Sequence, residues 1–237
     1  FNNQNKPLKN KIYLIDIPLD YKKLSLAKKN KYISKSFEIG LNLLKKKYSS
    51  ALINGPISKA TFLKGRYNGI TEFLAIKTKS INEVMLIFNK ELSVCPITTH
   101  VHINKVAEKI KKKLIINKVQ NIYEFYKKFL GFNPNIAITG LNPHCETFTG
   151  KNIEKKEILP AINFLKKKKV KVLGPFSADT IFLKENRKNF NVVVGMYHDQ
   201  VLAPMKSIFG FNAINITIGL PFIRISPDHG PNYKMFG

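Results

Sequence analysis

Apolar residues along the chain alternate between two spacings, which predict helices and strands in turn. From residue 32 to 47, positions such as Ile33, Phe37 and Leu41 lie at helical spacing, and lysines fill positions between them. Residues 191–195 instead form a short β-branched run, which is typical of a buried strand. The first pattern predicts an amphipathic helix with one face in a core, and the second predicts a strand covered on both sides.

The same two patterns recur through the sequence and divide it into predicted elements. Predicted strands occupy residues 12–17, 51–53, 83–88, 92–99, 135–139, 170–173 and 191–195. Predicted helices occupy residues 32–47, 103–110, 114–130, 153–167 and 178–185. Strands that alternate with helices in this way form βαβ units, so the sequence predicts an α/β fold with a largely parallel sheet.

Polar segments follow five of the predicted strands. They comprise residues 54–59, 98–102, 142–146, 177–180 and 196–206. Because ligands bind at the carboxyl edge of open α/β sheets, we expect all five segments to project from one edge and to form a site there. The last segment contains His198, Asp199 and Lys206, and we interpret it as a loop at the end of its strand.

Three of the five histidines, His100, His144 and His198, occupy equivalent positions after predicted strands. A single histidine at such a position is typical of a hydrogen-bonded structural residue. Three in register favour a metal site with three imidazole ligands and an open position for substrate. Cys145 is either a further ligand for a soft metal or a small apolar residue of the core.

Lys206, Asn215 and Arg224 form a spaced trio of hydrogen-bond donors in the last part of the chain. Asn215 lies inside an otherwise apolar run, where a buried amide needs a partner. A substrate carboxylate or phosphate is one such partner, and the alternative is a surface lysine with a structural Asn and Arg. Residues 54–59 resemble a phosphate cradle only loosely, and no GxGxxG motif is present.

Composition narrows the classes of protein that the chain can belong to. The net charge is +25, but only three of the 40 Lys+Arg residues are arginines and the lysines are spread along the chain, which argues against a specific nucleic-acid reader. Two cysteines fit a reducing compartment, and no apolar run is long enough to span a membrane. We therefore expect a cytoplasmic protein without a membrane partner.

Several ordered motifs together cover most of the chain from residue 51 onward. They are Thr98-Thr99-His100, Leu141-Asn142-Pro143-His144, Gly174-Pro175-Phe176-Ser177-Ala178-Asp179-Thr180, Tyr197-His198-Asp199-Gln200 and the run from Asn215 to Gly230. These motifs resemble those of the 4-hydroxythreonine-4-phosphate dehydrogenase family of vitamin B6 biosynthesis. The resemblance implies a fold similar to those of isocitrate and isopropylmalate dehydrogenases, with two α/β domains around a cleft. It also implies a homodimer with a divalent metal, Zn, Mg, Mn or Co, at the subunit interface.

The same resemblance implies an activity and assigns roles to residues. The activity would be the metal-dependent oxidation of 4-phosphooxy-L-threonine with NAD or NADP, followed by loss of CO₂. The implied metal ligands are His100, His144 and His198, and the implied substrate contacts are Thr71, Lys206, Asn215 and Arg224. Asp179 or Asp199 would orient a ligand histidine or relay the proton.

Alternatives remain beside this interpretation. Related family members act on other phosphorylated hydroxyacids, such as erythronate or threonate 4-phosphate. A metal hydrolase or aldolase would use similar residues without a nicotinamide, and an inactive remnant or binding protein would keep only the fold. Ile70 also stands where the family has a histidine, so one substrate contact is expected to be absent.

The resemblance further predicts how the chain divides into domains. Residues 1–73 and 231–237 would form a partial terminal α/β domain, and residues 74–230 a central α/β domain that carries the dimer interface. The family's first segment, with its Gly-Glu-Pro-Ala-Gly type loop, has no counterpart in the sequence. We therefore expect the chain to be a fragment or a truncated product.

Overall fold

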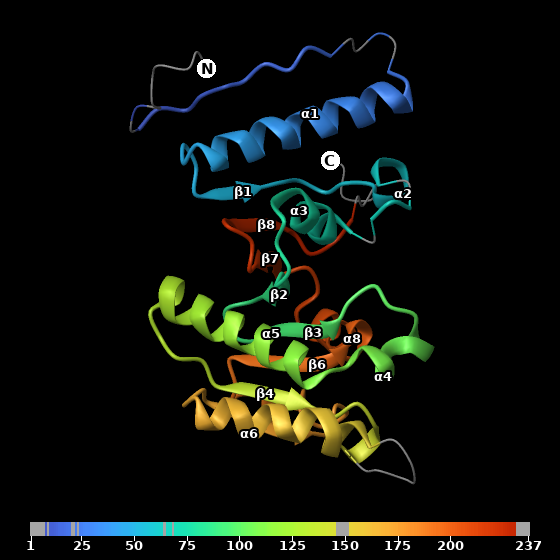
Figure 1. Cartoon of the computed structure of the whole chain (residues 1–237), viewed down its shortest axis with the longest axis vertical. Helices are drawn as coiled ribbons and strands as arrows, with labels where there is room; N and C mark the ends of the chain where they lie inside the picture. Colours follow the sequence, from blue (N-terminus) through green and yellow to red (C-terminus); the bar gives the residue numbers. More distant parts are fainter. Residues whose placement is uncertain are drawn as a thin grey trace.

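The computed structural model describes residues 8, 10–19, 22, 24–63, 65–67, 69–145 and 152–230, apart from the side chains of residues 59 and 60. Glu146, in one predicted site segment, and the predicted terminal segment 231–237 lie outside the described residues. Eight strands form one sheet in the order β1-β8-β7-β2-β3-β6-β4-β5 (Figure 1). The strands are β1 (Ala51–Ile53), β2 (Val84–Phe88), β3 (Ser93–Thr98), β4 (Ile136–Thr139), β5 (Val172–Phe176), β6 (Val192–Tyr197), β7 (Ile214–Ile218) and β8 (Ile223–Pro227).

Strand direction divides this sheet into two halves. Strands β3, β6, β4 and β5 all run parallel to one another. In the other half, β1 is parallel to β8, but β8, β7, β2 and β3 are joined by three antiparallel pairings. After three reversals β1 and β8 run opposite to β3, so β1 and the parallel half present opposite strand ends at any one edge. The sheet is mixed and mostly parallel, as the alternation of elements predicts.

Helices cover both faces of the sheet. They are α1 (Leu26–Lys45), α2 (Lys59–Phe62), α3 (Ile70–Thr78), α4 (Val106–Lys109), α5 (Lys112–Phe125), α6 (Leu159–Lys167), α7 (Lys184–Arg187) and α8 (His198–Phe209). Short 3₁₀ or π turns adjoin them at Ile103–Lys105, Tyr126–Leu130, Pro143–Cys145 and Glu154–Ile158. No helix among the described residues is long and apolar enough to cross a membrane.

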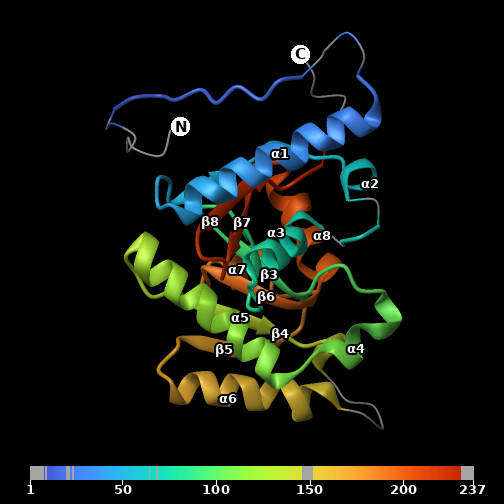
Figure 2. The ribbon, with the colours of Figure 1, turned by 45° about the horizontal axis from the view of Figure 1, so that its top comes forward.

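The two faces of the sheet have separate cores because side chains alternate along each strand. On one face, Ile115 of α5 and Ile162 of α6 pack with Val194, and Figure 2 shows these two helices side by side. On the other face, Val201 and Met205 of α8 pack around Val193. The sheet therefore separates α5 and α6 from α8, and the candidate site lies on the α8 face.

The predicted strand at residues 12–17 is absent, which corrects the sequence interpretation. The segment is extended but forms no strand, and Ile12 and Leu14 are 103% and 95% exposed. A strand needs a neighbour for its backbone groups. Helix α1 lies between this segment and β1, the terminal strand of the described sheet (Figures 1 and 2), so that edge is out of its reach.

Two other predicted elements differ in kind. The predicted helix at 178–185 is a series of turns followed by the short α7. The turns are held by the Ile181 N–H, which donates to the Ser177 carbonyl at 3.1 Å, and by the Asn186 amide, which donates to the Thr180 carbonyl at 2.8 Å. The second of these bonds comes from a side chain, and hydrogen bonds from side chains to the backbone compete with helix formation.

The predicted loop at 196–206 is also wrong, because α8 begins directly at His198. Pro204 in this segment argues against a helix, but buried Val201 and Met205, four residues apart, supply a helical apolar face. His198 and Asp199 therefore occupy the first turn of a helix. The other predicted elements are confirmed, with ends shifted by a few residues.

The predicted domain boundary at 73/74 stays a prediction. Strand β1 of the proposed terminal domain pairs with β8 of the proposed central domain, so the sheet is continuous across the two.

Candidate active site

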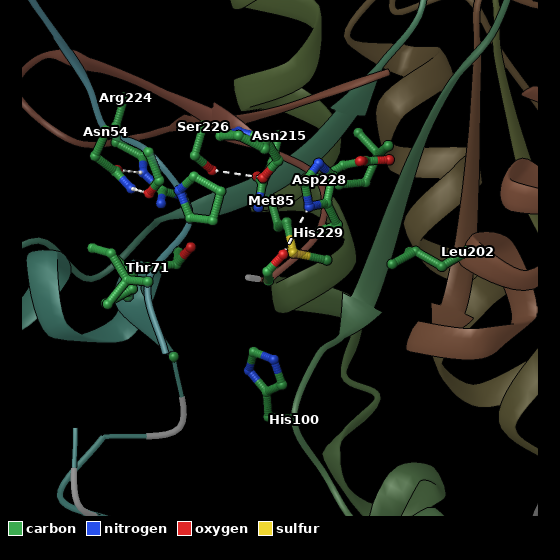
Figure 3. A pocket seen from close by; sticks show the side chains of 18 of the residues that line it. Asn54, Thr71, Met85, His100, Leu202, Asn215, Arg224, Ser226, Asp228 and His229 are labelled. Atoms are coloured by element: carbon green, nitrogen blue, oxygen red, sulfur yellow. Dashed lines mark hydrogen bonds between the residues drawn. The ribbon is translucent and has the colours of Figure 1, made fainter. Parts of the chain in front are cut away.

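A cavity of about 120 Å³ lies against the face of the antiparallel half of the sheet (Figure 3). Asn215 on β7 stands opposite Ile87 on β2 and Ser226 on β8. Residues that are opposite one another in antiparallel strands point to the same face, so these three side chains line the cavity together. The start of α3, His100 and His198 complete its wall.

Arg224 is the buried cation of this cavity. The residue is 4% exposed. Its Nε donates to Asn54 Oδ1 at 2.8 Å and one terminal nitrogen donates to Thr217 Oγ1 at 3.4 Å. Burial lowers the pKa of the guanidinium to about 10. No carboxylate in the described part of the chain pairs with Arg224, so its charge is suited to an anionic ligand.

The N-terminus of α3 adds further donors to the same wall. Gly69, Ile70 and Thr71 all line the cavity, and Thr71 Oγ1 lies 3.4 Å from Thr217 Oγ1. The first N–H groups of a helix lack partners within the helix, and its dipole favours a negative charge there. With Arg224, this end of α3 forms a corner that is suited to an anion and is built from two separate parts of the chain; we call it the anion-binding corner.

Lys206 stands at the border of the cavity. Its Nζ forms an ion pair with Asp228 and lies 4.7 Å from the centroid of the Phe211 ring. The Asp228 side chain is 1% exposed and lines the cavity. Two buried acceptors here, Asp228 Oδ1 and Asn215 Oδ1, have no hydrogen-bond partner among the described residues, which suits a ligand that also donates hydrogen bonds.

His100 and His198 form a pair on the opposite wall. Their ring centroids are 6.0 Å apart and the rings are inclined by 36°. His100 Nδ1 lies 3.1 Å from Glu72 Oε1, and His198 Nδ1 lies 2.7 Å from Asp199 Oδ1. A carboxylate accepts from Nδ1–H in many metal sites, and it directs Nε2 toward the metal. Both rings also border a second cavity of about 400 Å³, together with Asp199.

Glu72 remains ionised beside His100. Burial by itself would raise the pKa of the Glu72 carboxyl group, but hydrogen bonds from His100, from its own backbone N–H and from Thr99 outweigh burial, so the pKa is lowered overall. Thr99 Oγ1 donates to Glu72 Oε1 at 3.3 Å. Gly69 makes this packing feasible, because a Cβ there would lie 2.6 Å from Glu72 Oε2 and 2.9 Å from His100 Cε1.

His144 and Asp179 lie further along the sheet edge. His144 follows β4 in an exposed turn with a φ of 54°. Asp179 follows β5, close enough to Cys145 to help raise the pKa of that thiol, although burial is the main cause. The described residues contain no cluster of three His, Cys, Asp or Glu that could hold a metal ion. The structure thus brings His100 and His198 together, and the three-histidine ligand set stays a prediction.

The expectation that all five polar segments share one sheet edge needs correction. The segments after β3, β6, β4 and β5 do share an edge, because these strands are parallel. Asn54 follows β1, which runs in the opposite direction. Asn54 still lines the cavity, because its side chain turns to the face of the sheet and accepts a hydrogen bond from Arg224. The alternation of strands and helices does not reveal the antiparallel steps that cause this difference.

Comparison with known proteins places this geometry in a family. The family model described as pyridoxal phosphate biosynthetic protein PdxA matches residues 2–237. The chain belongs to the PdxA family. The family resemblance of the sequence motifs is thereby confirmed.

Several PdxA relatives are similar over most of the chain. A 4-hydroxythreonine-4-phosphate dehydrogenase from Sulfurihydrogenibium sp. is 40% identical over 98% of this chain and 74% of its own length. A putative D-threonate 4-phosphate dehydrogenase from Oceanobacillus iheyensis is 36% identical over 79% of this chain and 58% of its own length. The solved structure of a putative 4-hydroxythreonine-4-phosphate dehydrogenase from Salmonella typhimurium has a TM-score of 0.76 and 31% identity, and it covers 88% of this chain and 65% of that one.

These comparisons confirm the predicted fold class. The PdxA dehydrogenases have the isocitrate dehydrogenase-like fold, and this chain shares it. The chain spans between about three fifths and three quarters of the relatives' lengths. The relatives named above are dehydrogenases, which are oxidoreductases that act on a CH–OH group.

Several site residues of this PdxA chain were not found from residue patterns. Asp228 lies within the motif run from Asn215 to Gly230, but no pattern indicates that it pairs with Lys206. Glu72 follows Thr71 directly, yet its contact with His100 joins residues 28 positions apart. Asn215 could be found from the sequence because it is a polar residue within an apolar run. The pairs made by Asp228 and Glu72 could not, because they depend on tertiary contacts.

Proposed function

We propose that the chain catalyses the metal-dependent, NAD- or NADP-linked oxidation of 4-phosphooxy-L-threonine in pyridoxal 5′-phosphate biosynthesis. The C3 hydroxyl group would lose a proton and C3 would lose a hydride to the nicotinamide. The product, 2-amino-3-oxo-4-phosphooxybutanoate, then loses CO₂ to give 3-amino-2-oxopropyl phosphate. The names of the relatives support this substrate.

One observation carries the proposal. A single cavity joins an anion-binding corner, made by Arg224 and the N-terminus of α3, to a pair of carboxylate-held imidazoles, His100 and His198. An acidic substrate with a reactive hydroxyl group requires both features. The corner binds an anionic end of the substrate, and the imidazole wall faces its functional groups.

The residues present fit a divalent metal. Imidazoles whose Nδ1 is held by a carboxylate are typical metal ligands, and the Glu72–His100 and Asp199–His198 pairs have this arrangement. We assign His100 and His198 as ligands in this chain, with His144 as the third. When bound, the metal would lower the pKa of the substrate hydroxyl group and stabilise the charge that develops on its oxygen.

The other residues bind and orient the substrate. Arg224, Thr71 and the α3 N–H groups would hold one anionic end. Lys206 would hold the other, after exchanging part of its contact with Asp228 for the ligand. Asn215, with an unpartnered Oδ1 in the cavity, would contact the polar groups between these ends. The nicotinamide would accept the hydride from C3.

We assign the proton relay to Asp199 rather than to Asp179. Asp199 is bonded to His198, and its side chain is 82% exposed, so it connects the cavity with solvent. Asp179 is placed near Cys145 instead. We further propose that the protein acts as a cytoplasmic homodimer, in which a second subunit could complete the metal site. The two unpaired cysteines are consistent with a reducing compartment.

A second substrate is supported by one relative. The Oceanobacillus iheyensis protein is named as a putative D-threonate 4-phosphate dehydrogenase. Threonate 4-phosphate carries a hydroxyl group where phosphooxythreonine carries an amino group, and both share the anionic ends that the cavity would bind. The reaction would be the same oxidation at C3 of a four-carbon acid that carries a hydroxyl group at C2 in place of the amino group.

The test is a direct assay of the purified chain. The protein is incubated with 4-phosphooxy-L-threonine, NAD or NADP, and one of Zn²⁺, Mg²⁺, Mn²⁺ or Co²⁺, and reduced nicotinamide is followed by its absorbance. Arg224→Met is expected to raise the KM for substrate by roughly 10- to 100-fold, and Arg66→Met is the matched control because Arg66 is exposed on the surface.

The outcomes separate the candidates. Metal-dependent reduction with phosphooxythreonine supports the proposal, and a clear preference for D-threonate 4-phosphate favours the second substrate. If no nicotinamide is reduced with any metal, nucleotide or substrate, both proposed activities are wrong.

A further inference from the structure

Gln200 occupies a gap between the ends of β4 and β6, the strands that precede His144 and His198. Strands β4 and β6 pair in parallel register as far as Ile138 opposite Val194. Continuing this register by two residues would place Gly140 opposite Met196. The strands do not pair there, and the side-chain amide of Gln200 lies between them instead.

Among the described residues, this amide forms its hydrogen bonds with the two strand ends. Gln200 Oε1 accepts from the Met196 N–H at 2.6 Å and from Thr139 Oγ1 at 3.0 Å. Gln200 Nε2 donates to the Gly140 carbonyl at 2.9 Å. The amide thus replaces the backbone ladder at the point where the strands separate. Because buried backbone groups need partners, this contact fixes the width of the gap.

The surrounding sequence is adapted to this side chain. A Cβ on Gly195 would lie 3.0 Å from Gln200 Oε1 and 2.4 Å from a methyl carbon of Val201, so only glycine leaves the amide its position. Thr139, which donates to the amide, is fully buried. Gln200 lies in the first turn of α8, two residues after His198, and Gly140 lies four residues before His144.

A carboxylate holds the far side of the same turn. Glu154, 2% exposed, accepts from the Leu141 and Asn142 N–H groups at 3.0 and 2.9 Å. The Asn142 amide also donates to it, at 3.2 and 3.0 Å to the two carboxylate oxygens. The turn that carries His144 is therefore held to α8 by Gln200 and to the π turn at Glu154–Ile158 by Glu154.

We propose that Gln200 is a positioning residue that sets the distance between the His144 turn and the start of α8 with His198. The role of these histidines as metal ligands rests on the proposed function, but the mechanical role of Gln200 does not. Gln200 acts through the backbone of Gly140 and Met196, to which its amide is hydrogen-bonded. It differs in this respect from Asp199, which holds the His198 ring itself.

The first readout needs no metal. Amide hydrogen exchange is compared between the unmodified protein, Gln200→Met and Thr139→Val. Gln200→Met keeps the length of the side chain but removes three hydrogen bonds, so exchange in residues 141–145 and 196–199 should accelerate by roughly tenfold or more. Thr139→Val removes one of them and should have a smaller effect in the same segments. It also provides a readout if Gln200→Met does not fold.

Gln120→Met is the matched control, because it makes the same chemical change on α5, on the opposite face of the sheet. It should leave both segments unchanged. Exchange in β7 should also be unchanged in every variant, since β7 belongs to the other half of the sheet.

The second readout is the affinity for Zn²⁺ or Co²⁺, measured by titration well below the unfolding temperature of each variant. Gln200→Met should weaken it about 10- to 100-fold, the usual effect of losing a residue that supports a ligand. Unchanged exchange in residues 141–145, or acceleration spread equally over β7, overturns the proposal. So does local acceleration with unchanged metal affinity. If the unmodified protein binds no metal while the local acceleration is seen, the proposed function fails and the positioning role of Gln200 is supported.

Discussion

The two halves of the sheet build their parts of the cavity in different ways. In the antiparallel half, Arg224, Asn215 and Ser226 point from the face of the sheet, and Arg224 is held by Asn54 and Thr217. In the parallel half, the histidines lie beyond the ends of strands, and carboxylates hold their rings: Glu72 from α3 holds His100, and the adjacent Asp199 holds His198. One half supplies cavity residues from within its strands, and the other supplies them from positions after its strands end.

The two halves therefore differ in what holds their cavity side chains in place. A side chain in the middle of a strand is fixed by the hydrogen bonds of the sheet, so the anion-binding corner is preorganised with few helpers. A side chain after a strand lacks that support, and the chain supplies Glu72, Asp199 and Gln200 to replace it. Substitutions should therefore affect the two halves independently.

The largest expected effect is on the parallel half. His198→Ala should weaken binding of Zn²⁺ or Co²⁺ by at least about 100-fold, because it removes a ligand rather than a supporting residue. Binding of inorganic phosphate at the other wall should change by less than about twofold, as expected for independent sites. Both are measured by calorimetric titration. His102→Ala is the control, and metal affinity equal to that of the unmodified protein in His198→Ala would remove His198 from the ligand set.

The matching test of the antiparallel half is Arg224→Met. Losing charge-assisted hydrogen bonds of about 1.5–3 kcal/mol should raise the KM for substrate by roughly 10- to 100-fold. The free energy of unfolding should stay the same or rise, because a buried cation without a carboxylate partner is costly to desolvate. Thermal unfolding and steady-state kinetics measure the two effects. A marked loss of stability with an unchanged KM would show that Arg224 is purely structural.

A smaller effect should distinguish the two carboxylates that hold the histidines. Glu72→Gln should weaken metal binding about 10- to 100-fold, and Asp199→Asn should weaken it less. The Glu72 side chain is 23% exposed and that of Asp199 is 82% exposed, so solvent screens Asp199 more strongly. Titration of both variants with the same metal shows which substitution weakens metal binding more. The reverse order would mean that exposure does not decide the strength of these contacts.

The smallest effect concerns pH. The pKa of Glu72 is lowered in the folded protein from its ordinary value of 4.5, so its contribution to stability is fully present above that value. It is lost as pH falls through the lower folded pKa, because the unfolded chain takes up the proton first. The difference in unfolding temperature between the metal-free protein and Glu72→Gln should shrink as pH falls from 7 to 3. A difference that grows on acidification would contradict this sign.

The sequence was informative where a local pattern determines structure. Runs of apolar residues located the first six of the eight described strands, but β7 and β8 were not predicted. The ends of predicted strands located His100 and His198, which the structure places side by side. Asn215 stood out as a polar residue in an apolar run, and in the cavity its Oδ1 has no hydrogen-bond partner among the described residues. In these cases the signal lies within a few residues of the position that it predicts.

The remainder depends on contacts between distant segments. The reversal of β1 relative to β3 follows from three antiparallel pairings that no local pattern reveals. The partners Glu72 and Asp228 are chosen by tertiary packing, and α8 forms despite Pro204 because buried Val201 and Met205 outweigh propensity. The segment at 12–17 shows the converse, since alternating apolar residues form no strand without a neighbour.

The hydrogen bond between Asn54 and Arg224 has a consequence for how the protein acquires its site. These residues are 170 positions apart, and the Thr71 and Thr217 hydroxyls beside them are 146 apart. Contacts at such separation form late, because a long loop must close before they stabilise anything. During synthesis, the strands of the parallel half can assemble first, and the anion-binding corner is completed only when β8 has emerged and paired with β1.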